Sequence, residues 1–315
     1  MTFRFWGTRG SVPTPLSPAA VRAKISSVLQ RVKAIDVASV EAKERFLAGL
    51  PEELFGHVGG NTTCLEVVSQ QQTDVVFVDA GTGLVEAGRF YETNSKGPVH
   101  YHIFLTHFHW DHIQGLPFFP GLNRSENTIT LYSPVGGFER FIHEQMRAPF
   151  FPVPLSIFPA RVEFSELKGS RVTLGSLIVT WKTVQHPGSC VSYRFDADDR
   201  ALVFSTDTEL RAADFVKTGE NNKFYEAVDV LVMDAQYTLG EAIEKADWGH
   251  SSASLAVDFA VEFHVRCLYL FHHEPSNSDA KIEEIGRLAQ WYADHKKAGH
   301  LEVKLAREGR SQVIT

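Results

Sequence analysis

The stretch Thr106-His107-Phe108-His109-Trp110-Asp111-His112 decides how this chain is interpreted. Four side chains that commonly bind metals stand within six residues, directly after the apolar run Tyr101–Leu105, which is typical of a buried strand. In an extended segment His107 and His109 point to the same side, because side chains alternate with a period of two. Asp111 and His112 then begin a helix and face a neighbouring point. Burying four such groups without a metal is costly, so the stretch predicts two adjacent divalent ions. Imidazoles with a carboxylate match zinc first, with manganese or iron as alternatives.

Apolar runs and amphipathic stretches alternate on both sides of this turn, which predicts an α/β fold. Further strands end in polar side chains, namely Asp79, Asp207 and the pair His272-His273. Ligands at strand ends are the usual way in which an α/β protein builds a site on a rigid frame. The predicted strands are Phe3–Trp6, Cys64–Val68, Val75–Val78, Tyr101–Leu105, Ile129–Tyr132, Leu177–Thr183, Val191–Phe195, Ala201–Phe204, Val228–Met233 and Leu268–Phe271. The predicted helices are Pro18–Ala34, Val40–Ala48, Phe138–Met146, Ser252–Phe263 and Asp279–His295, the last capped by Ser278.

The segment Leu16–Phe55 differs from the rest of the chain, because it contains two helical patterns and no His or Cys. We expect a helical insertion beside the core, which packs against it or contacts a second copy of the chain in a homodimer. No linker-like stretch interrupts the remaining sequence, so we expect one domain over residues 1–315.

Composition narrows the class of partner. The formal net charge is −7 and the pI about 6.1, which disfavours a nucleic-acid substrate without excluding one, because nucleic-acid affinity arises mostly at phosphates. We therefore expect a small-molecule substrate. No apolar run approaches the length of a membrane span, and the first residues read as a strand. Three scattered cysteines predict no disulfide framework, so we expect a cytoplasmic protein without membrane contact.

The signature from Thr106 to His112 resembles that of the metallo-β-lactamase-fold hydrolases. The segments Phe5-Trp6-Gly7-Thr8-Arg9-Gly10-Ser11 and Gly59-Gly60-Asn61-Thr62-Thr63-Cys64 resemble the phosphodiesterase and ribonuclease Z branch of that superfamily. The resemblance runs from Phe3 through the final helix, apart from the insertion. It implies a four-layer αβ/βα sandwich.

The same resemblance completes the metal ligands. It implies that His107, His109 and His186 hold the first ion, and that Asp207 bridges both ions. Asp111, His112 and a residue after Leu268–Phe271 would hold the second ion. His272 matches the family pattern better, while His273 stays an alternative. Asp79 is either a partner that orients a ligating imidazole or a turn residue ahead of Gly81 and Gly83, and the two roles are compatible.

Trp248-Gly249-His250-Ser251-Ser252 resembles the segment that carries a catalytic histidine in the phosphodiesterase branch. It implies that His250 contacts the scissile phosphate and protonates the leaving oxygen. The hydroxyls of Ser251 and Ser252 and the following helix start would favour an anionic phosphate. We count Asp111 as both a ligand and a catalytic residue.

The expected reaction is hydrolysis of cyclic nucleotides or other small phosphodiesters by a hydroxide that bridges the two metals. The alternatives are a ribonuclease Z-like endonuclease that processes tRNA 3′ ends, a thioester or lactone hydrolase, and a metal-bound sensor without turnover. Arg147 is expected to be solvated. The aromatic residues near the signature are more often core than stacking platforms; they are Phe108, Trp110, Phe118, Phe119, Phe150, Phe151 and Trp248.

Overall fold

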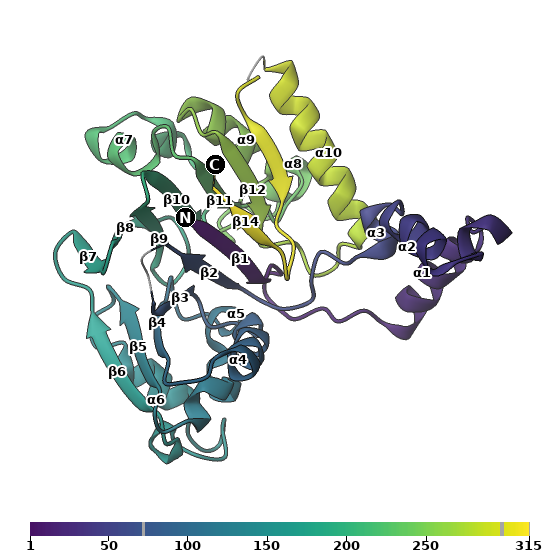
Figure 1. The fold of residues 1–315 in the computed structure, drawn as a ribbon. Helices are drawn as coiled ribbons and strands as arrows, with labels where there is room; N and C mark the ends of the chain where they lie inside the picture. Colours follow the sequence, from purple (N-terminus) through teal and green to yellow (C-terminus); the bar gives the residue numbers. More distant parts are fainter. Residues whose placement is uncertain (71–72, 297–298, 315) are drawn as a thin grey trace.

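The computed structural model describes residues 1–70, 73–296 and 299–314, which form two stacked seven-stranded sheets (Figure 1). The strand order is β14-β1-β2-β3-β4-β5-β6 in the first sheet and β13-β12-β11-β10-β9-β8-β7 in the second. In each sheet one half is parallel and the other antiparallel. The first sheet contains β1 (Thr2–Gly7), β2 (Cys64–Val68), β3 (Val75–Val78), β4 (His100–Phe104), β5 (Thr128–Ser133), β6 (Arg161–Glu166) and β14 (Ser311–Val313). The second contains β7 (Arg171–Leu174), β8 (Leu177–Val184), β9 (Cys190–Ala197), β10 (Arg200–Ser205), β11 (Val230–Asp234), β12 (Cys267–Phe271) and β13 (Glu302–Leu305).

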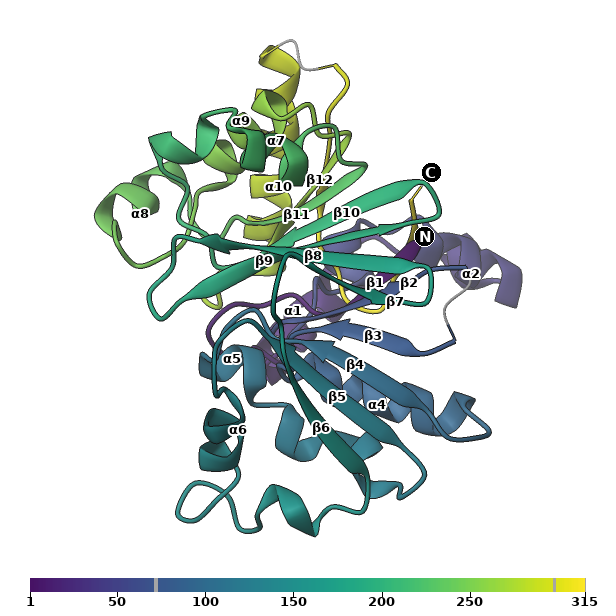
Figure 2. The same cartoon turned by 90° about the vertical axis from the view of Figure 1, so that its left-hand side faces the viewer.

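Helices cover the outer face of each sheet, as Figure 2 shows. The α-helices are α1 (Pro18–Leu29), α2 (Val40–Ala48), α3 (Glu52–Phe55), α4 (Gly83–Asn94), α5 (Trp110–Ile113), α6 (Glu139–Gln145), α7 (Gly219–Tyr225), α8 (Leu239–Glu244), α9 (Ala253–Glu262) and α10 (Asp279–His295). One apolar core lies between the sheets, a second lies under α7, α9 and α10, and a third lies under α4 and α6. The expected four-layer αβ/βα sandwich is confirmed.

The cores explain why the sequence of a central strand is apolar throughout. Tyr101, Ile103 and Leu105 face the core under α4 and α6, whereas Phe104 faces the core between the sheets. A strand buried on both faces reads as a continuous apolar run, which is what the sequence shows here.

Some predicted boundaries are wrong. The helix expected over Pro18–Ala34 ends at Leu29, and a separate 3-10 turn covers Ala34–Val37, whose side chains no core contacts. The strand expected over Val228–Met233 is displaced to Val230–Asp234. Ser278 does cap α10, because its side chain accepts a hydrogen bond from the Lys281 N–H.

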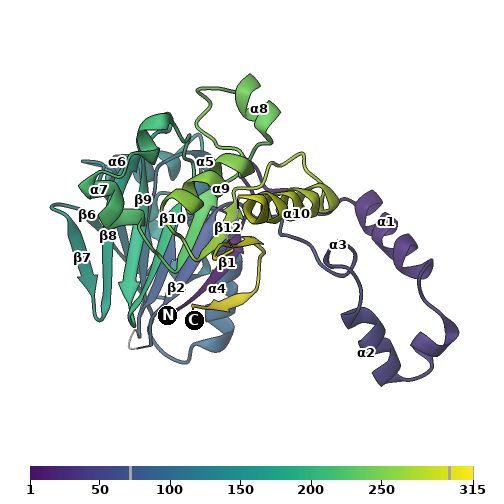
Figure 3. The same ribbon diagram turned by 90° about the horizontal axis from the view of Figure 1, so that it is seen from above.

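The helical segment Leu16–Phe55 projects from the sandwich beside the start of α10, as seen from above in Figure 3. Helices α1, α2 and α3 contain no buried residue. Its attachment is polar: Lys24 Nζ lies 2.7 Å from Asp279 Oδ2, and His57 Nδ1 lies 2.8 Å from Asp279 Oδ1. The sequence predicts that this segment packs against the core or contacts a second copy of the chain. The helices pack little against the core, and the homodimer and the single-domain boundaries stay predictions.

Among the described residues, no helix has both the length and the apolar character required to cross a bilayer.

Candidate metal centre

The strand ends from both sheets converge at one edge of the sandwich. Asp79 follows β3, His107 follows β4 after two residues, Asp207 follows β10, and His272 follows β12. Asp79, Asp207 and His272 have positive φ angles of 62°, 47° and 59°. That conformation is uncommon for residues other than glycine and is found most often where a side chain must be aimed at a functional site.

The first group of side chains comprises His107, His109, His186 and Asp207, whose ligand-type atoms all lie within 4.8 Å of one another. His186 Nε2 is 3.1 Å from His109 Nδ1 and 3.5 Å from Asp207 Oδ2. His107 Nε2 is 3.7 Å from the same oxygen. His109 is the exposed member, so this group opens to solvent.

The second group comprises Asp111, His112 and His272, again within 4.8 Å of one another. The other oxygen of Asp207, Oδ1, lies 3.1 Å from His112 Nε2 and 3.3 Å from His272 Nε2. Asp207 therefore presents one oxygen to each group. The backbone N–H of Ser11 donates to Asp111 Oδ2 at 2.7 Å and fixes that carboxylate.

Buried atoms test whether divalent cations fit here. Among the described residues, His107 Nε2 and His112 Nε2 are buried and find no hydrogen-bond partner, although carboxylate oxygens lie near both. Unpartnered buried nitrogens are costly and rare, and a metal would satisfy them.

The charge of the buried side chains also indicates that divalent cations fit this site. Asp79, Asp111, Asp207 and Asp234 are all buried, and within the described chain none of them pairs with a lysine or arginine. Asp234 is paired with His250, and divalent cations would supply the positive charge that Asp79, Asp111 and Asp207 do not receive from a lysine or arginine. Burial lowers the pKa of His107 well below its ordinary value. Burial also lowers the pKa of His112, but Asp207, Asp111 and Asp79 raise it well above its ordinary value.

His272 and His273 point in different directions. His272 lies against Asp111 and Asp207, whereas His273 Nε2 donates to the Ala306 carbonyl at 2.9 Å. Burial lowers the pKa of His273 to about 3, so this ring is a neutral link between the loop and the end of β13. The geometry therefore favours His272 over His273 as a ligand.

The outer nitrogens of the imidazoles are held by neighbouring groups. Asp79 Oδ2 accepts from His112 Nδ1 at 2.7 Å, and its other oxygen accepts from the Thr106 N–H at 2.8 Å. His186 Nδ1 donates to the Gly249 carbonyl at 2.9 Å. Such contacts fix the tautomer and the ring orientation of a ligand. The structure places Asp79 in the orienting position that the resemblance implied.

His250 lies beside the second group and forms a pair with Asp234. Its Nδ1 is 2.6 Å from Asp234 Oδ2, and its ring stacks on His272 with centroids 4.9 Å apart. Burial lowers the pKa of His250, but Asp234 raises it to a net value of about 9. The imidazole is thus held as a proton donor.

Sequence reasoning missed Asp234, Gln236 and Glu209. Gln236 Oε1 accepts from His272 Nδ1 at 3.1 Å, and Glu209 Oε2 accepts from the Gly249 N–H at 3.0 Å. A signal existed for Asp234, because it ends an apolar strand as Asp79 follows another. Gln236 and Glu209 carry no such signal in the sequence, because only the folded chain brings them next to the site.

The expectation for Ser251 and Ser252 is wrong. Ser251 Oγ donates to the Thr208 carbonyl at 2.6 Å and accepts from the Leu210 N–H at 2.9 Å. Ser252 Oγ accepts from the Leu255 N–H at 3.2 Å as the cap of α9. Both hydroxyls are buried and committed within the chain, so they are not free to bind a phosphate.

Several of the aromatic side chains singled out in the sequence are exposed. Trp110, Phe118, Phe150 and Trp248 are 62–66% exposed, contrary to the expectation that they belong to the core. Phe119 is fully buried, and Phe108 and Phe151 are partly buried. A hollow of about 240 Å³ has a lining that includes Phe108, Trp110, Phe141 and Phe150. Arg147 is on the surface, 3.8 Å from Glu144, as expected.

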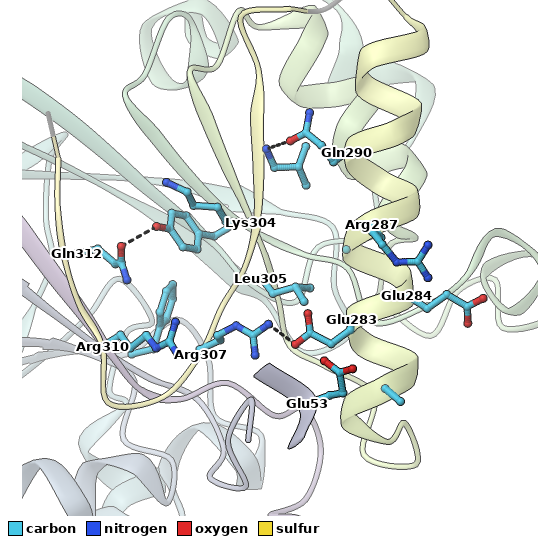
Figure 4. A pocket seen from close by; sticks show the side chains of 15 residues that line it. Glu53, Glu283, Glu284, Arg287, Gln290, Lys304, Leu305, Arg307, Arg310 and Gln312 are labelled. Atoms are coloured by element: carbon cyan, nitrogen blue, oxygen red, sulfur yellow. Dashed lines mark hydrogen bonds and ion pairs between the residues drawn. The ribbon is translucent and has the colours of Figure 1, made fainter. Parts of the chain in front are cut away.

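A separate cavity of about 720 Å³ lies between α10 and β13, and Figure 4 shows its charged lining. None of the site residues predicted from sequence lines it. Its lining mixes both signs of charge, and Arg307 is already paired with Glu283 there. We place the chemistry at the strand ends instead.

Comparison with known proteins identifies the family of the chain. Residues 75–273 match the family model described as a beta-lactamase superfamily domain. Ribonuclease Z of Streptococcus gordonii is 27% identical over 257 residues, which cover 64% of this chain and 80% of that protein. The metallo-beta-lactamase fold protein YhfI from Bacillus subtilis superposes with a TM-score of 0.64 at 14% identity, over 99% of this chain and 98% of that one. A diphosphatase from the PhnP family gives 0.63 at 17% identity, over 100% and 98%.

Proposed function

Because the chain belongs to the metallo-β-lactamase superfamily and is a metal-dependent hydrolase, we propose that it cleaves P–O bonds in small phosphodiesters such as cyclic nucleotides. One observation carries the proposal. The Asp207 carboxylate lies between two groups of imidazoles, and the His250–Asp234 pair stands at the edge of the second group. Two electrophilic centres with a proton donor beside them suit a reaction in which an oxygen leaving group must be protonated.

The proposed cofactors are two divalent ions, zinc first. His107, His109, His186 and Asp207 Oδ2 would hold one ion, and Asp111, His112, His272 and Asp207 Oδ1 the other. Imidazole and carboxylate donors of this kind suit zinc, with manganese and iron as alternatives. When bound, two such ions supply an activated water at neutral pH and neutralise charge on the phosphoryl oxygens.

His250 would deliver the proton to the leaving oxygen from Nε2. Asp234 accepts from Nδ1, keeps the ring in one orientation and favours its protonated form. The carboxylate of Asp234 is itself fixed, because Oδ1 accepts from the N–H groups of Ser251 and Gln236 at 3.1 and 3.2 Å. Asp111 would hold its ion through Oδ2, and a catalytic part for Asp111 stays a prediction.

The aromatic residues at the opening support a substrate with a flat, apolar group. Trp110 and Phe150 line the hollow of about 240 Å³, and both are exposed. Exposed aromatic rings at a site mouth are suited to stacking on a nucleobase or an aryl group. A cyclic nucleotide offers both a phosphodiester and a base.

A ribonuclease that processes tRNA 3′ ends is the second candidate, since a curated ribonuclease Z is 27% identical. The charge around the opening argues against it. The formal net charge is −7, and Arg211 beside the His250 loop is already paired with Asp247 and Glu209. A protein that grips tRNA generally carries a basic surface there.

The test is a substrate panel assayed with zinc or manganese at controlled ionic strength. It contains cyclic nucleotides, bis-p-nitrophenyl phosphate, precursor tRNA, a thioester and a lactone. We expect the highest kcat/KM for a cyclic nucleotide and none above background for the thioester or lactone. Precursor tRNA cleaved with a higher kcat/KM than any small phosphodiester would replace the first candidate by the second. A preference for the thioester or lactone would reject both.

A further inference from the structure

A second cluster of ligand-type side chains lies at the opposite ends of the strands that carry the metal centre. Asp74 immediately precedes β3, and His100 and His102 lie near the start of β4. Their ligand-type atoms lie within 4.8 Å of one another. From His102 to His107 the chain runs five residues, about 17 Å at roughly 3.3 Å per residue, so this cluster does not share ligands with the first.

The two imidazoles turn their inner nitrogens to the same carboxylate oxygen. Asp74 Oδ2 is 3.1 Å from His102 Nε2 and 3.6 Å from His100 Nδ1. The remaining oxygen of Asp74, Oδ1, accepts from the Thr73 hydroxyl at 3.3 Å. His100 and His102 face the same side because they are two residues apart on one strand, and their ring centroids are 4.0 Å apart.

The outer nitrogens are held by hydroxyl groups from the next strand. His100 Nε2 contacts Thr130 Oγ1 at 2.8 Å, and His102 Nδ1 contacts the Tyr132 hydroxyl at 2.9 Å, both on β5. Thr130 in turn donates to Glu163 Oε2 at 3.4 Å. A ligating histidine typically donates its free N–H to such a partner, which fixes the tautomer and turns the other nitrogen towards the metal.

Burial and charge suit a cation. His102 is 4% exposed, and burial lowers its pKa, which keeps the ring neutral as a ligand must be. Two imidazoles this close repel each other if both are charged. The side chains of His100 and Asp74 are 35% and 38% exposed, so an ion can enter from solvent. Without a cation, Asp74 Oδ2 would be the only acceptor facing both imidazole nitrogens. One of them, His100 Nδ1, lies 3.6 Å away, which is too long for a hydrogen bond.

We infer that Asp74, His100 and His102 form a third metal site, which binds one zinc ion and fastens the start of β3 to β4. Two imidazole nitrogens and one carboxylate oxygen leave a fourth position of a tetrahedron for water. Copper and nickel would also bind such donors, since the order of affinities favours them. The site is independent of the hydrolytic reaction.

Metal counting tests the inference. The full chain and a His100→Asn/His102→Asn double variant are dialysed against equal free zinc, and bound zinc is measured by mass spectrometry. We expect the variant to bind one ion fewer per chain and to keep its phosphodiesterase activity. The matched control is His143→Asn, which removes an exposed histidine that faces a single carboxylate, Glu139, at 3.2 Å. Equal zinc in the double variant and the wild type would overturn the inference.

Two further measurements test the inference if the double variant fails to fold. Asp74→Asn changes a partly exposed carboxylate with little effect on packing, and it too should bind one ion fewer. Anomalous scattering from zinc-soaked crystals of the wild type should show a peak about 2.1 Å from His100 Nδ1 and His102 Nε2. Peaks confined to the first metal centre would reject the site.

Discussion

Single residues adjust the metal centre through the space that they leave as much as through the atoms that they contribute. Gly10 shows this most clearly. A Cβ atom at this position would lie 2.5 Å from both Cε1 and Nδ1 of His272. Gly249 leaves the same kind of space beside His186, at a φ of 91°. The glycines in the Phe5–Ser11 and Trp248–Ser252 segments thus allow two imidazoles to approach the ligand positions.

Gly10→Ala should weaken metal binding without touching a ligand. The methyl group displaces His272 and breaks its hydrogen bond to Gln236, so we expect the affinity for one ion to fall about 10–100-fold. Titration with zinc against a chelating indicator measures the change. Gly97→Ala is the control, because no described atom lies within 4 Å of the added methyl. Unchanged zinc affinity in Gly10→Ala would show that His272 does not depend on this space.

His250→Gln should slow the reaction in a way that depends on the leaving group. A leaving alkoxide needs the proton that His250 supplies, so turnover of a cyclic nucleotide should fall about 100–1000-fold. p-Nitrophenolate leaves without protonation, so bis-p-nitrophenyl phosphate should lose far less. Bound metal is measured alongside and should stay the same. An equal loss with both substrates would assign His250 to positioning instead.

At the scale of elements, the strands that lead into site residues were predictable from the sequence. The edge strands and helix α4 were not. The apolar runs before Asp79, His107, Asp207 and His272 identified the strands, because strands buried on two faces read as continuous apolar sequence. The edge strands β6, β7, β13 and β14 were missed, since they are only partly buried and alternate with charged residues. Helix α4 was missed because glycines interrupt its apolar face.

The site residues also divide into those that the sequence alone could identify and those that it could not. His107, His109, Asp111 and His112 were readable because they lie in one short stretch. His186, Asp207 and His272 were carried over from a family resemblance, since only the fold brings distant strand ends together. The choice of His272 over His273 and the pairing of His250 with Asp234 required coordinates, because neighbouring residues at a strand end point in opposite directions.

Trp110 follows His109 at the start of α5 and is 62% exposed, which gives a prediction about substrate affinity. Trp110→Ala should raise KM for a cyclic nucleotide about 10-fold, since stacking on one base contributes roughly 1–3 kcal/mol. kcat should change little. Trp291→Ala on α10 is the control, because Trp291 is 56% exposed and stacks on His295 away from the site. An equal KM in wild type and Trp110→Ala would remove the stacking role.

At the scale of the whole molecule, the carboxylate of Asp279 helps to attach the helical segment Leu16–Phe55, together with the ion pair of Glu52 with Arg310. Asp279 at the start of α10 contacts Lys24, His57 and Arg9, the last at 3.7 Å. Burial raises the pKa of Asp279, but hydrogen bonds from His57 and Lys24 lower it to a net value far below the ordinary one.

The sign of the pH dependence follows. The folded state holds Asp279 ionised, so its contribution to the free energy of unfolding is fully present above the ordinary pKa of about 4. It declines as pH falls below that value and is lost only as pH falls through the much lower folded-state pKa. Asp279→Asn should lower the free energy of unfolding by about 2 kcal/mol at pH 7 and by a smaller amount at pH 3, where the folded protein still holds this carboxylate ionised. Urea unfolding at both values measures this. Asp294→Asn, at the far end of α10, should show no such difference; the same pH dependence in both variants would contradict the assignment.

The division of the chain between the two sheets has a further consequence. Residues 2–166 build the first sheet apart from β14, and residues 171–305 build the second. His107, His109, Asp111 and His112 come from the first half of the sequence, whereas His186, Asp207 and His272 come from the second. Neither half can complete a coordination shell by itself. Binding of the proposed ions would therefore stabilise the assembled halves over the separated ones, because only the assembled chain offers every ligand.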